Sequence, residues 1–227
     1  MIKTKITITA LTLIAIICNS NLYAAKTNVP AAKRENIEWT DVWLTNCTKD
    51  NKPHVLLVGD SITKGYYNGV AKQLKAKAYT GRFATSLCVA DPAYIPTLKA
   101  ILLQVEFDVI HFNNGLHGVD YTEEQYAEGY RNAINTIKEI QPGAKIIVTL
   151  STPLKKGSNK EHLNPRIDKR NQIATKIAKQ TGAAIDDLNT PMRNHPEYHR
   201  DPYHYKGKAI TLQATQVAAS ISSTLEK

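Results

Sequence analysis

The sequence has no uninterrupted apolar run of eighteen residues or more, which is what a helix needs to cross a bilayer. We therefore expect no stable membrane span. It also has no internal repeat and no low-complexity tract, which excludes a repeat architecture. What remains is a chain of 227 residues, 42% hydrophobic and 22% charged, with the composition of a soluble globular protein and room for one ordinary domain.

Cysteine is scarce as well. The chain has only Cys18, Cys47 and Cys88, so a framework of several disulfides is excluded. If the N-terminal segment is removed on export, Cys47 and Cys88 remain as one pair in a compartment that permits disulfides. We predict that these two cysteines form a bridge, and two separate buried thiols are the alternative.

The N-terminus has the three parts of an export signal. Met1–Lys5 carries two lysines, Ile6–Cys18 is almost wholly apolar, and the polar stretch that follows ends in small residues at Ala25. Cleavage after Ala24 or Ala25 is expected. A lipoprotein signal that uses Cys18 is disfavoured by the bulky residue before it, and a buried N-terminal helix is the other alternative.

These features divide the chain into a signal peptide (1–24), a flexible leader (25–37) and one folded domain (38–227). The protein is accordingly expected to be exported, to the periplasm or the extracellular space. Loss of the signal would remove two lysines and no acid, so the formal charge would fall from +9 to +7. Because the basic residues are scattered rather than gathered beside aromatic residues, we expect no nucleic-acid partner. An attraction to acidic glycans stays open.

The folded part alternates between short apolar runs and amphipathic stretches. After a first packed piece at 39–44, strands are predicted at 54–58, 82–85, 108–112, 144–150 and 183–188, and helices at 68–77, 93–104, 123–140, 164–181 and 206–225. Parallel strands separated by helices of this length require crossover connections. The pattern predicts a three-layer α/β/α fold with a central parallel sheet of about five strands.

The first candidate for chemistry is Ser61, within the tetrapeptide Gly-Asp-Ser-Ile directly after the first buried strand. In a parallel sheet the working residues gather where the strands end at their carboxyl edge. A serine near the N-terminus of the following helix also lies where backbone N–H groups favour developing negative charge. The alternative for this tetrapeptide is a turn that merely caps the helix.

The second candidate is the pair Asp201 and His204, within Asp-Pro-Tyr-His in a loop before the last helix. An aspartate three residues before a histidine can hold one ring nitrogen, which leaves the other nitrogen to take a proton from a serine. For this motif alone, a capping aspartate and a surface histidine are the alternative.

Taken together, a serine after the first strand and an Asp-x-x-His before the final helix resemble the SGNH (GDSL-type) hydrolase family, from about Trp39 to the C-terminus. The resemblance implies a flavodoxin-like α/β/α fold, with Ser61 as nucleophile, His204 as general base and then general acid, and Asp201 as the residue that orients it. The Gly-x-Ser-x-Gly elbow of the α/β-hydrolases is absent, since Thr63 stands in the place of its second glycine.

The resemblance also implies an oxyanion site made of the Ser61 N–H, a second-block N–H and a third-block side chain. Ala90 stands where the second-block glycine is expected. The third block reads Asn-Asn-Gly-Leu-His from residue 113 to 117, and it looks like that of a subgroup in which histidine takes the place of the family asparagine. Either Asn114 or His117 could donate to the oxyanion, and both stay open.

A dense cluster of possible metal ligands raises a zinc hydrolase as an alternative; it comprises His195, Glu197, His199, Asp201 and His204. Pro196 makes a helical His-x-x-x-His pair in this cluster unfavourable, and no His-Glu-x-x-His motif occurs. We therefore predict no metal and no cofactor.

The combined motifs predict an exported serine esterase that acts through an acyl-enzyme on a small-molecule or polysaccharide ester. O-acetyl groups on a carbohydrate are the favoured substrate. A lipase or thioesterase type of acyl hydrolase ranks lower because no extended apolar loop segment suggests a long acyl pocket. The alternative from another class is a catalytically silent carbohydrate-binding protein, which the departures at Ala90 and His117 motivate. The oligomeric state cannot be inferred.

Overall fold

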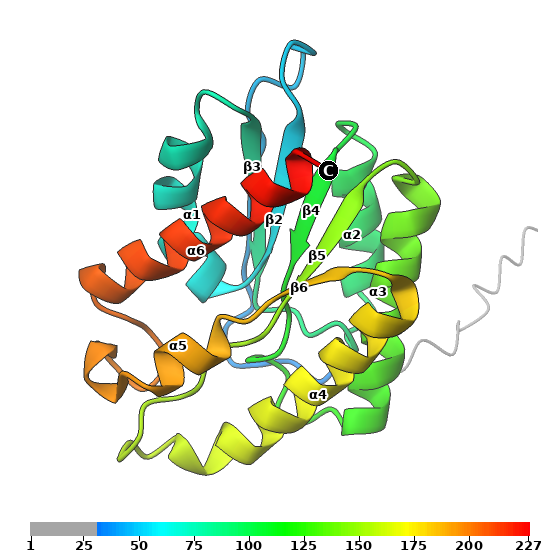
Figure 1. Cartoon of the computed structure of the whole chain (residues 1–227). Helices are drawn as coiled ribbons and strands as arrows, with labels where there is room; N and C mark the ends of the chain where they lie inside the picture. Colours follow the sequence, from blue (N-terminus) through cyan, green and yellow to red (C-terminus); the bar gives the residue numbers. More distant parts are fainter. Residues whose placement is uncertain (1–30) are drawn as a thin grey trace, which may run out of the picture. The chain divides into compact units, whose positions relative to one another are not determined.

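The structure, a computed structural model, describes residues 31–227 and is built around a sheet of six strands with helices on both faces (Figure 1). The strands are β1 (Thr40–Trp43), β2 (His54–Gly59), β3 (Tyr79–Thr85), β4 (Val109–Phe112), β5 (Lys145–Thr149) and β6 (Ala184–Asp186). The helices are α1 (Ser61–Leu74), α2 (Tyr94–Leu102), α3 (Glu123–Ile140), α4 (Asn164–Thr181), α5 (Asn189–Arg193) and α6 (Gly207–Leu225), with short 3-10 turns η1 (Glu161–Leu163) and η2 (Pro196–Tyr198).

The strands lie in the order β1-β3-β2-β4-β5-β6. All neighbours from β3 to β6 pair in parallel, and β1 pairs antiparallel with β3 at one edge. The predicted three-layer fold with five parallel strands is therefore confirmed, and β1 adds a sixth strand.

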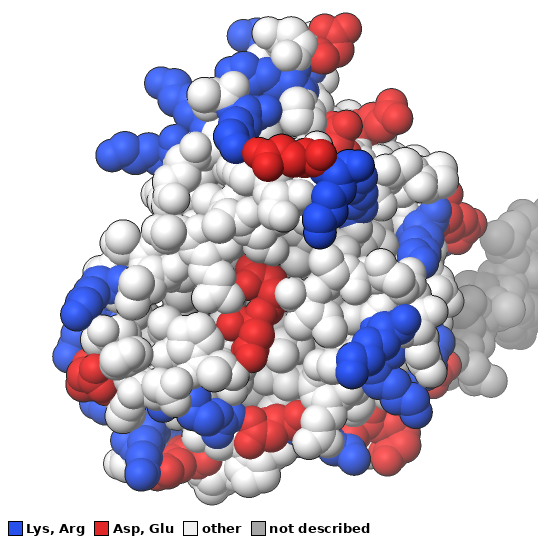
Figure 2. Space-filling model, viewed as in Figure 1, with Lys and Arg blue, Asp and Glu red and all other residues white. Residues whose placement is uncertain are grey.

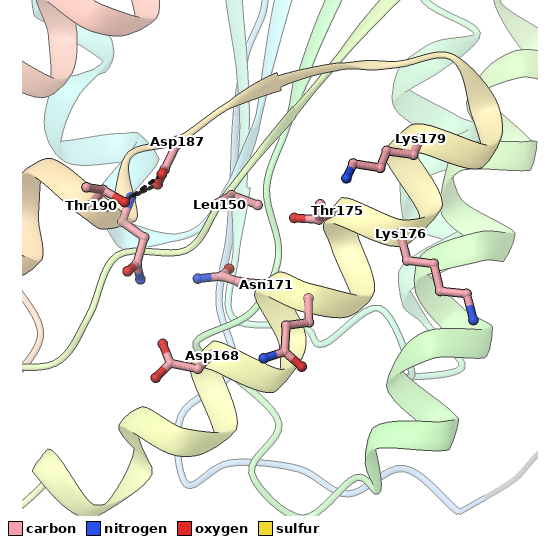
Figure 3. Close-up of a pocket in the computed structure, with 10 residues that line it drawn as sticks. Leu150, Asp168, Asn171, Thr175, Lys176, Lys179, Asp187 and Thr190 are labelled. Carbon is pink, nitrogen blue, oxygen red and sulfur yellow. Dashed lines mark hydrogen bonds between the residues drawn. The ribbon is translucent and has the colours of Figure 1, made fainter.

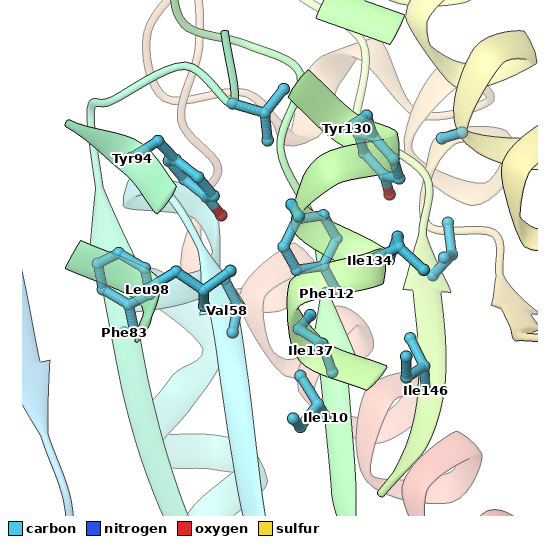
Figure 4. Packing of buried hydrophobic residues seen from close by; sticks show 14 of the residues in the cluster. Val58, Phe83, Tyr94, Leu98, Ile110, Phe112, Tyr130, Ile134, Ile137 and Ile146 are labelled. Atoms are coloured by element: carbon cyan, nitrogen blue, oxygen red, sulfur yellow. The ribbon is translucent and has the colours of Figure 1, made fainter. Parts of the chain in front are cut away.

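Strand β2 lies inside the sheet and is buried on both faces, as its continuous apolar run predicts. Val55 and Leu57 pack in one layer with α1 and α6, whereas Val58 packs in the other with α2, α3 and α4. Figure 4 shows this second layer, in which the rings of Phe112 and Tyr130 meet edge to face with centroids 5.1 Å apart. Packing in both layers holds β2 in place. It thereby also fixes the position of Asp60 and Ser61, which follow β2 directly.

Two predicted helices, 123–140 and 164–181, have the bounds observed for α3 and α4. A capping box between Thr122 and Gln125 starts α3, and Gly182 ends α4 in the left-handed conformation. Both signals are local, which is why they could be recognised in the sequence.

The prediction for the first helix, 68–77, is wrong at its start because α1 begins at Ser61. Asp60 caps the helix, since its Oδ1 accepts the N–H of Ile62 at 2.8 Å. Two glycines, Gly65 and Gly69, weaken the helical signal of the first turns. Ser61 therefore lies in the first turn of a helix and not in a loop.

The carboxyl ends of β2 and β4 form a topological switch point. From β2 the chain passes to β3 on one side and later to β4 on the other side. In open α/β sheets the connections diverge at such a point, and ligands bind in the crevice between them. Ser61 directly follows β2 and the block 113–117 directly follows β4, so the topology brings both to this crevice.

The predicted disulfide between Cys47 and Cys88 is wrong. Both cysteines are free, Cys47 exposed and Cys88 buried. Because Trp43 at the end of β1 pairs with Arg82 in an antiparallel register, Cys47 follows towards the amino end of β3, whereas Cys88 lies beyond its carboxyl end. A strand of seven residues spans about 20 Å, far beyond the Cα separation of about 7 Å that a disulfide tolerates.

Within residues 31–227, no helix is both long and apolar enough to cross a membrane. On the face shown in Figure 2, lysine and arginine side chains lie in several separate places with acidic side chains among them, as their scatter in the sequence suggests. The predicted signal peptide (1–24) and residues 25–30 of the predicted leader lie outside the described residues. Residues 31–37 form no helix or strand.

Gly129 of α3 permits a close contact with the loop after β3. A Cβ at this position would lie 2.3 Å from the carbonyl oxygen of Val89 and 2.8 Å from the nitrogen of Ala90. We expect Gly129→Ala to lower the free energy of unfolding by about 1–3 kcal/mol, despite the better helix propensity of alanine. Gly143→Ala is the control, because nothing lies within 4 Å of its added Cβ. Equal midpoints of urea unfolding for the two variants would contradict this contact.

Candidate active site

The structure brings Ser61, His204 and Asp201 together in one chain of hydrogen bonds. Nε2 of His204 lies 2.9 Å from Oγ of Ser61. Nδ1 of His204 lies 3.0 and 2.9 Å from Oδ1 and Oδ2 of Asp201. The serine and the histidine meet although 143 positions separate them in the sequence. This is the geometry of a nucleophile, a base and a carboxylate that orients the base.

Helix α1 supplies the electrostatic setting of Ser61. The first N–H groups of a helix have no intrahelical acceptor and lie at the positive end of the helix dipole. Asp60, directly before the serine, is buried, and its Oδ2 has no hydrogen-bond partner within the described residues. Burial raises the pKa of Asp60, while the charges of His117 and His204 act against this rise. Leu116, directly before His117, lines one small cavity together with Ile62, directly after Ser61, so the third block lies beside the start of α1.

A short loop between η2 and α6 holds Asp201 and His204. A bridge between His199 and Tyr205 closes this loop, and both side chains contact the carbonyl oxygen of Pro153, at 3.1 and 2.8 Å. Burial acts to raise the pKa of Asp201, but backbone N–H donors, including that of His204 at 2.8 Å, and the His204 ring hold it well below its usual range. The carboxylate is therefore ionised and fixes the ring.

One of the proposed oxyanion donors, Asn114, has other partners. Its side chain accepts the N–H of Val89 at 3.2 Å and donates to the carbonyl oxygen of Leu87 at 2.9 Å. Asn114 thus clamps the third block to the loop after β3, and these contacts favour a structural role for this residue.

His117 has a free ring nitrogen. Its Nδ1 lies 3.1 and 3.0 Å from the two carboxylate oxygens of Glu35, and Glu35 also accepts the N–H of Gly118 at 3.0 Å. Within residues 31–227, Nε2 of His117 makes no hydrogen bond, and the side chain stays 21% exposed, so the ring is open to a substrate. Of the candidates for the oxyanion site, the contacts leave open the N–H groups of Ser61 and Ala90 and the ring of His117.

Sequence reasoning missed Arg170 of α4, which holds the third block in place. Its buried guanidinium donates to the carbonyl oxygens of Gly115, His117 and Gly118, at 3.1, 2.6 and 2.9 Å. It also pairs with Glu123 at 3.4 Å. Gly118 itself has φ of +70°, a region that favours glycine. Nothing in the sequence distinguishes this arginine from the other basic residues of α4, and only its burial reveals its role.

The cluster that suggested a zinc site does not converge. His195 pairs with Glu197 at 3.0 Å on the surface. The ring nitrogens of His199 lie 3.2 and 3.1 Å from the carbonyl oxygens of Pro196 and Pro153. In the described part of the chain, no three His, Cys, Asp or Glu side chains come together as metal ligands. The other two members of the cluster are His204, which contacts Ser61, and Asp201, which contacts His204.

An open groove of about 690 Å³ lies along α4, and its lining includes none of the three residues Ser61, Asp201 and His204. In Figure 3, Asn171 and Thr175 of α4 face the segment that carries Asp187 and Thr190. Most of these polar groups already have partners, since Asn171 bonds the main chain of Ser151 and Asp187 caps the start of α5. These hydrogen bonds give most of the polar side chains named here a structural role.

No family model matches the sequence, and neither does any curated protein. Solved structures do match. A candidate GDSL-like lipase of Parabacteroides merdae superposes with a TM-score of 0.65 over 75% of this chain and 96% of its own, at 19% identity. A family 3 carbohydrate esterase of Talaromyces cellulolyticus matches with a TM-score of 0.63 over 77% of this chain and 98% of its own, at 16% identity.

An acetyl xylan esterase is also similar, with a TM-score of 0.60 over 74% of this chain and 99% of its own, at 16% identity. Further matches carry the names SGNH hydrolase and GDSL-like lipase. The chain therefore has the α/β/α fold of the SGNH and GDSL-type hydrolases, and the resemblance found in the sequence is confirmed at the level of the fold.

Arg170→Leu should destabilise the protein, because it leaves three carbonyl oxygens of the third block without their partner and removes one of the two arginines that pair with Glu123. We expect the free energy of unfolding to fall by about 3 kcal/mol or more. Arg131→Leu, at an exposed position of α3, is the matched control and should stay within about 0.5 kcal/mol of the wild type. Chemical unfolding measures both. A loss for Arg170→Leu no larger than the control's would show that the buried contacts carry no net stability.

Proposed function

We propose that the protein is an exported serine esterase, in which Ser61 is the nucleophile, His204 the base and then the acid, and Asp201 the carboxylate that orients the ring. The contact of 2.9 Å between His204 Nε2 and Ser61 Oγ is the observation that carries the proposal. The ionised carboxylate on the far side of the ring supports it, because it selects the tautomer whose Nε2 can accept a proton.

The first half of the reaction forms an acyl-enzyme. Oγ of Ser61 attacks the carbonyl carbon of the ester while its proton passes to Nε2 of His204, and the carbonyl oxygen takes the negative charge. Asp201 stabilises the imidazolium through Nδ1. The Ser61 N–H, at the positive end of α1, and the side chain of His117 stabilise the oxyanion. As the intermediate collapses, His204 gives its proton to the leaving alcohol.

The second half releases the acid. Water attacks the acyl carbon and gives a proton to His204, and the same donors stabilise the second oxyanion. The bond to Oγ then breaks, and the proton returns to Ser61. Every proton and electron pair in this cycle is accounted for by the ester, water and these side chains.

O-acetyl groups on a carbohydrate are the substrate that we favour. Two of the structural neighbours are named as an acetyl xylan esterase and a family 3 carbohydrate esterase. The small cavity lined by Ile62 and Thr63 has none of Ser61, Asp201 and His204 in its lining, so it does not identify the acyl group. A lipase or thioesterase substrate is disfavoured because no extended apolar loop segment in the sequence suggests a long acyl pocket.

Ser61→Ala should abolish ester hydrolysis, because it removes the atom that forms the acyl-enzyme. We expect kcat on a chromogenic short-chain acetate to fall by about a thousandfold or more. Ser223→Ala, at an exposed position of α6, serves as the matched control with wild-type rates. Equal rates for wild type and Ser61→Ala would leave the catalytically silent carbohydrate-binding protein as the better reading.

Asp201→Asn should lower kcat while the fold stays intact. An amide can donate its NH₂ group to Nδ1, and this stabilises the tautomer whose Nε2 carries a proton and cannot accept one from Ser61. The expected loss is about a thousandfold or more. Asp50→Asn, in an exposed loop, is the control. Measured on the same acetate, a change of less than about tenfold for Asp201→Asn would contradict the assigned role.

A further inference from the structure

Two histidines near Ser61 are each held by a carboxylate, and the two pairs come from opposite ends of the described chain. His204 is held by Asp201 from the loop before α6, and His117 is held by Glu35 from the segment before β1. In both pairs the carboxylate contacts Nδ1. His204 contacts Ser61, and Leu116, directly before His117, lines one cavity together with Ile62, directly after Ser61.

The same contact has opposite consequences for the two rings. A neutral histidine that donates Nδ1–H to a carboxylate has a bare Nε2, which can only accept a hydrogen bond. This suits His204, which must take a proton from Ser61. An oxyanion, however, needs a donor. His117 can therefore stabilise an oxyanion through Nε2 only while it carries a second proton and is an imidazolium.

The surroundings of His117 favour the imidazolium. Burial acts to lower the pKa of His117, but the hydrogen bond to Glu35 and the charges of Asp60, Glu35 and Glu38 leave it raised above its ordinary value. The positive charge of Arg170 opposes this, although its guanidinium meets the backbone carbonyl of His117 and not the ring. The pKa of Glu35 is lowered in turn, since its contacts with His117 and with a backbone N–H outweigh its burial.

The segment that carries Glu35 is fixed on both sides of it. The N–H of Lys33 donates to the hydroxyl of Tyr121 at 2.9 Å, and Arg34 pairs with Asp91 at 3.2 Å. Glu38 accepts the N–H of Glu35 at 2.9 Å. These contacts hold the carboxylate at a defined place beside the third block, although the segment has no regular secondary structure.

We propose that Glu35 is a positioning residue that keeps His117 protonated, so that His117 donates Nε2–H to the oxyanion and turnover falls at alkaline pH when His117 loses this proton. The proposal rests on the esterase function proposed above. The protonated fraction is complete at pH values below the raised pKa of His117 and is lost as the pH rises through it.

The test compares pH profiles of kcat on a short-chain acetate for wild type, Glu35→Gln and Glu38→Gln. Glu35→Gln should move the alkaline limb to lower pH by about one unit, so that kcat falls by up to about tenfold at pH values on that limb and by less at acidic pH. Glu38→Gln is the matched control, because it removes one negative charge from the same segment without a hydrogen bond to His117. Its alkaline limb should move by less than half as much.

A second variant separates the charge from mere packing. His117→Asn supplies an amide donor that does not titrate, so its alkaline limb should disappear, and adding Glu35→Gln to it should cause no further shift. The proposal is overturned if Glu35→Gln leaves the alkaline limb in place. It is also overturned if an alkaline limb persists in His117→Asn and Glu35→Gln shifts it there as much as in the wild type. A structural loss alone would lower kcat at every pH without moving the limb.

A readout without activity keeps the test independent of the proposed function. The imidazole signals of His117 are followed by NMR across the pH range in the wild type and in Glu35→Gln. Protonation of His117 that persists to higher pH in the wild type than in Glu35→Gln supports the pairing even if no ester is hydrolysed, in which case the esterase proposal alone fails. Identical titration curves for the two proteins would overturn the role of Glu35.

Discussion

The hydrogen bond between Ser61 and His204 depends on one constraint, which is that a parallel sheet brings all its strand ends to one edge. Ser61 follows the central strand β2, and His204 lies in the loop that leads into α6. Helix α6 packs directly on α1, in the same layer, so the two ends of the domain are held together by apolar burial. This packing makes the contact of 2.9 Å between Ser61 and His204 possible, and the contact itself adds little to the stability of the packed helices.

The third block shows how a polar loop is held rigid beside such a site. Three elements that are distant in the sequence contact it. Arg170 of α4 donates to three of its carbonyl oxygens, Asn114 ties it to the loop after β3, and Glu35 holds the ring of His117. Each of these contacts satisfies a buried or half-buried polar group, and together they leave the ring of His117 little freedom to rotate.

The two carboxylate–histidine pairs illustrate how one motif can serve two electrostatic purposes. Both carboxylates fix the tautomer and direction of a ring. Asp201 is partly exposed and also lies 3.4 Å from Arg200, whereas His117 has Glu35, Glu38 and Asp60 around it. The negative charge around His117 raises its pKa and so favours the second proton that an oxyanion donor needs.

The layers of the fold could be predicted from the sequence, and so could the likeness of its two motifs to those of a serine hydrolase. Both depend on apolar periodicity, helix caps and short spacings, which are local signals. The start of α1 was hidden by its glycines, and the disulfide was mispredicted because a Cys pair carries no information on distance. Only the three-dimensional contacts show that the side chain of Asn114 is bonded to the loop after β3, that a carboxylate holds the ring of His117, and which side chains hold the third block. Glu35 and Arg170 act across 82 and 53 residues of chain on His117, and contacts at that separation leave no pattern in a single sequence.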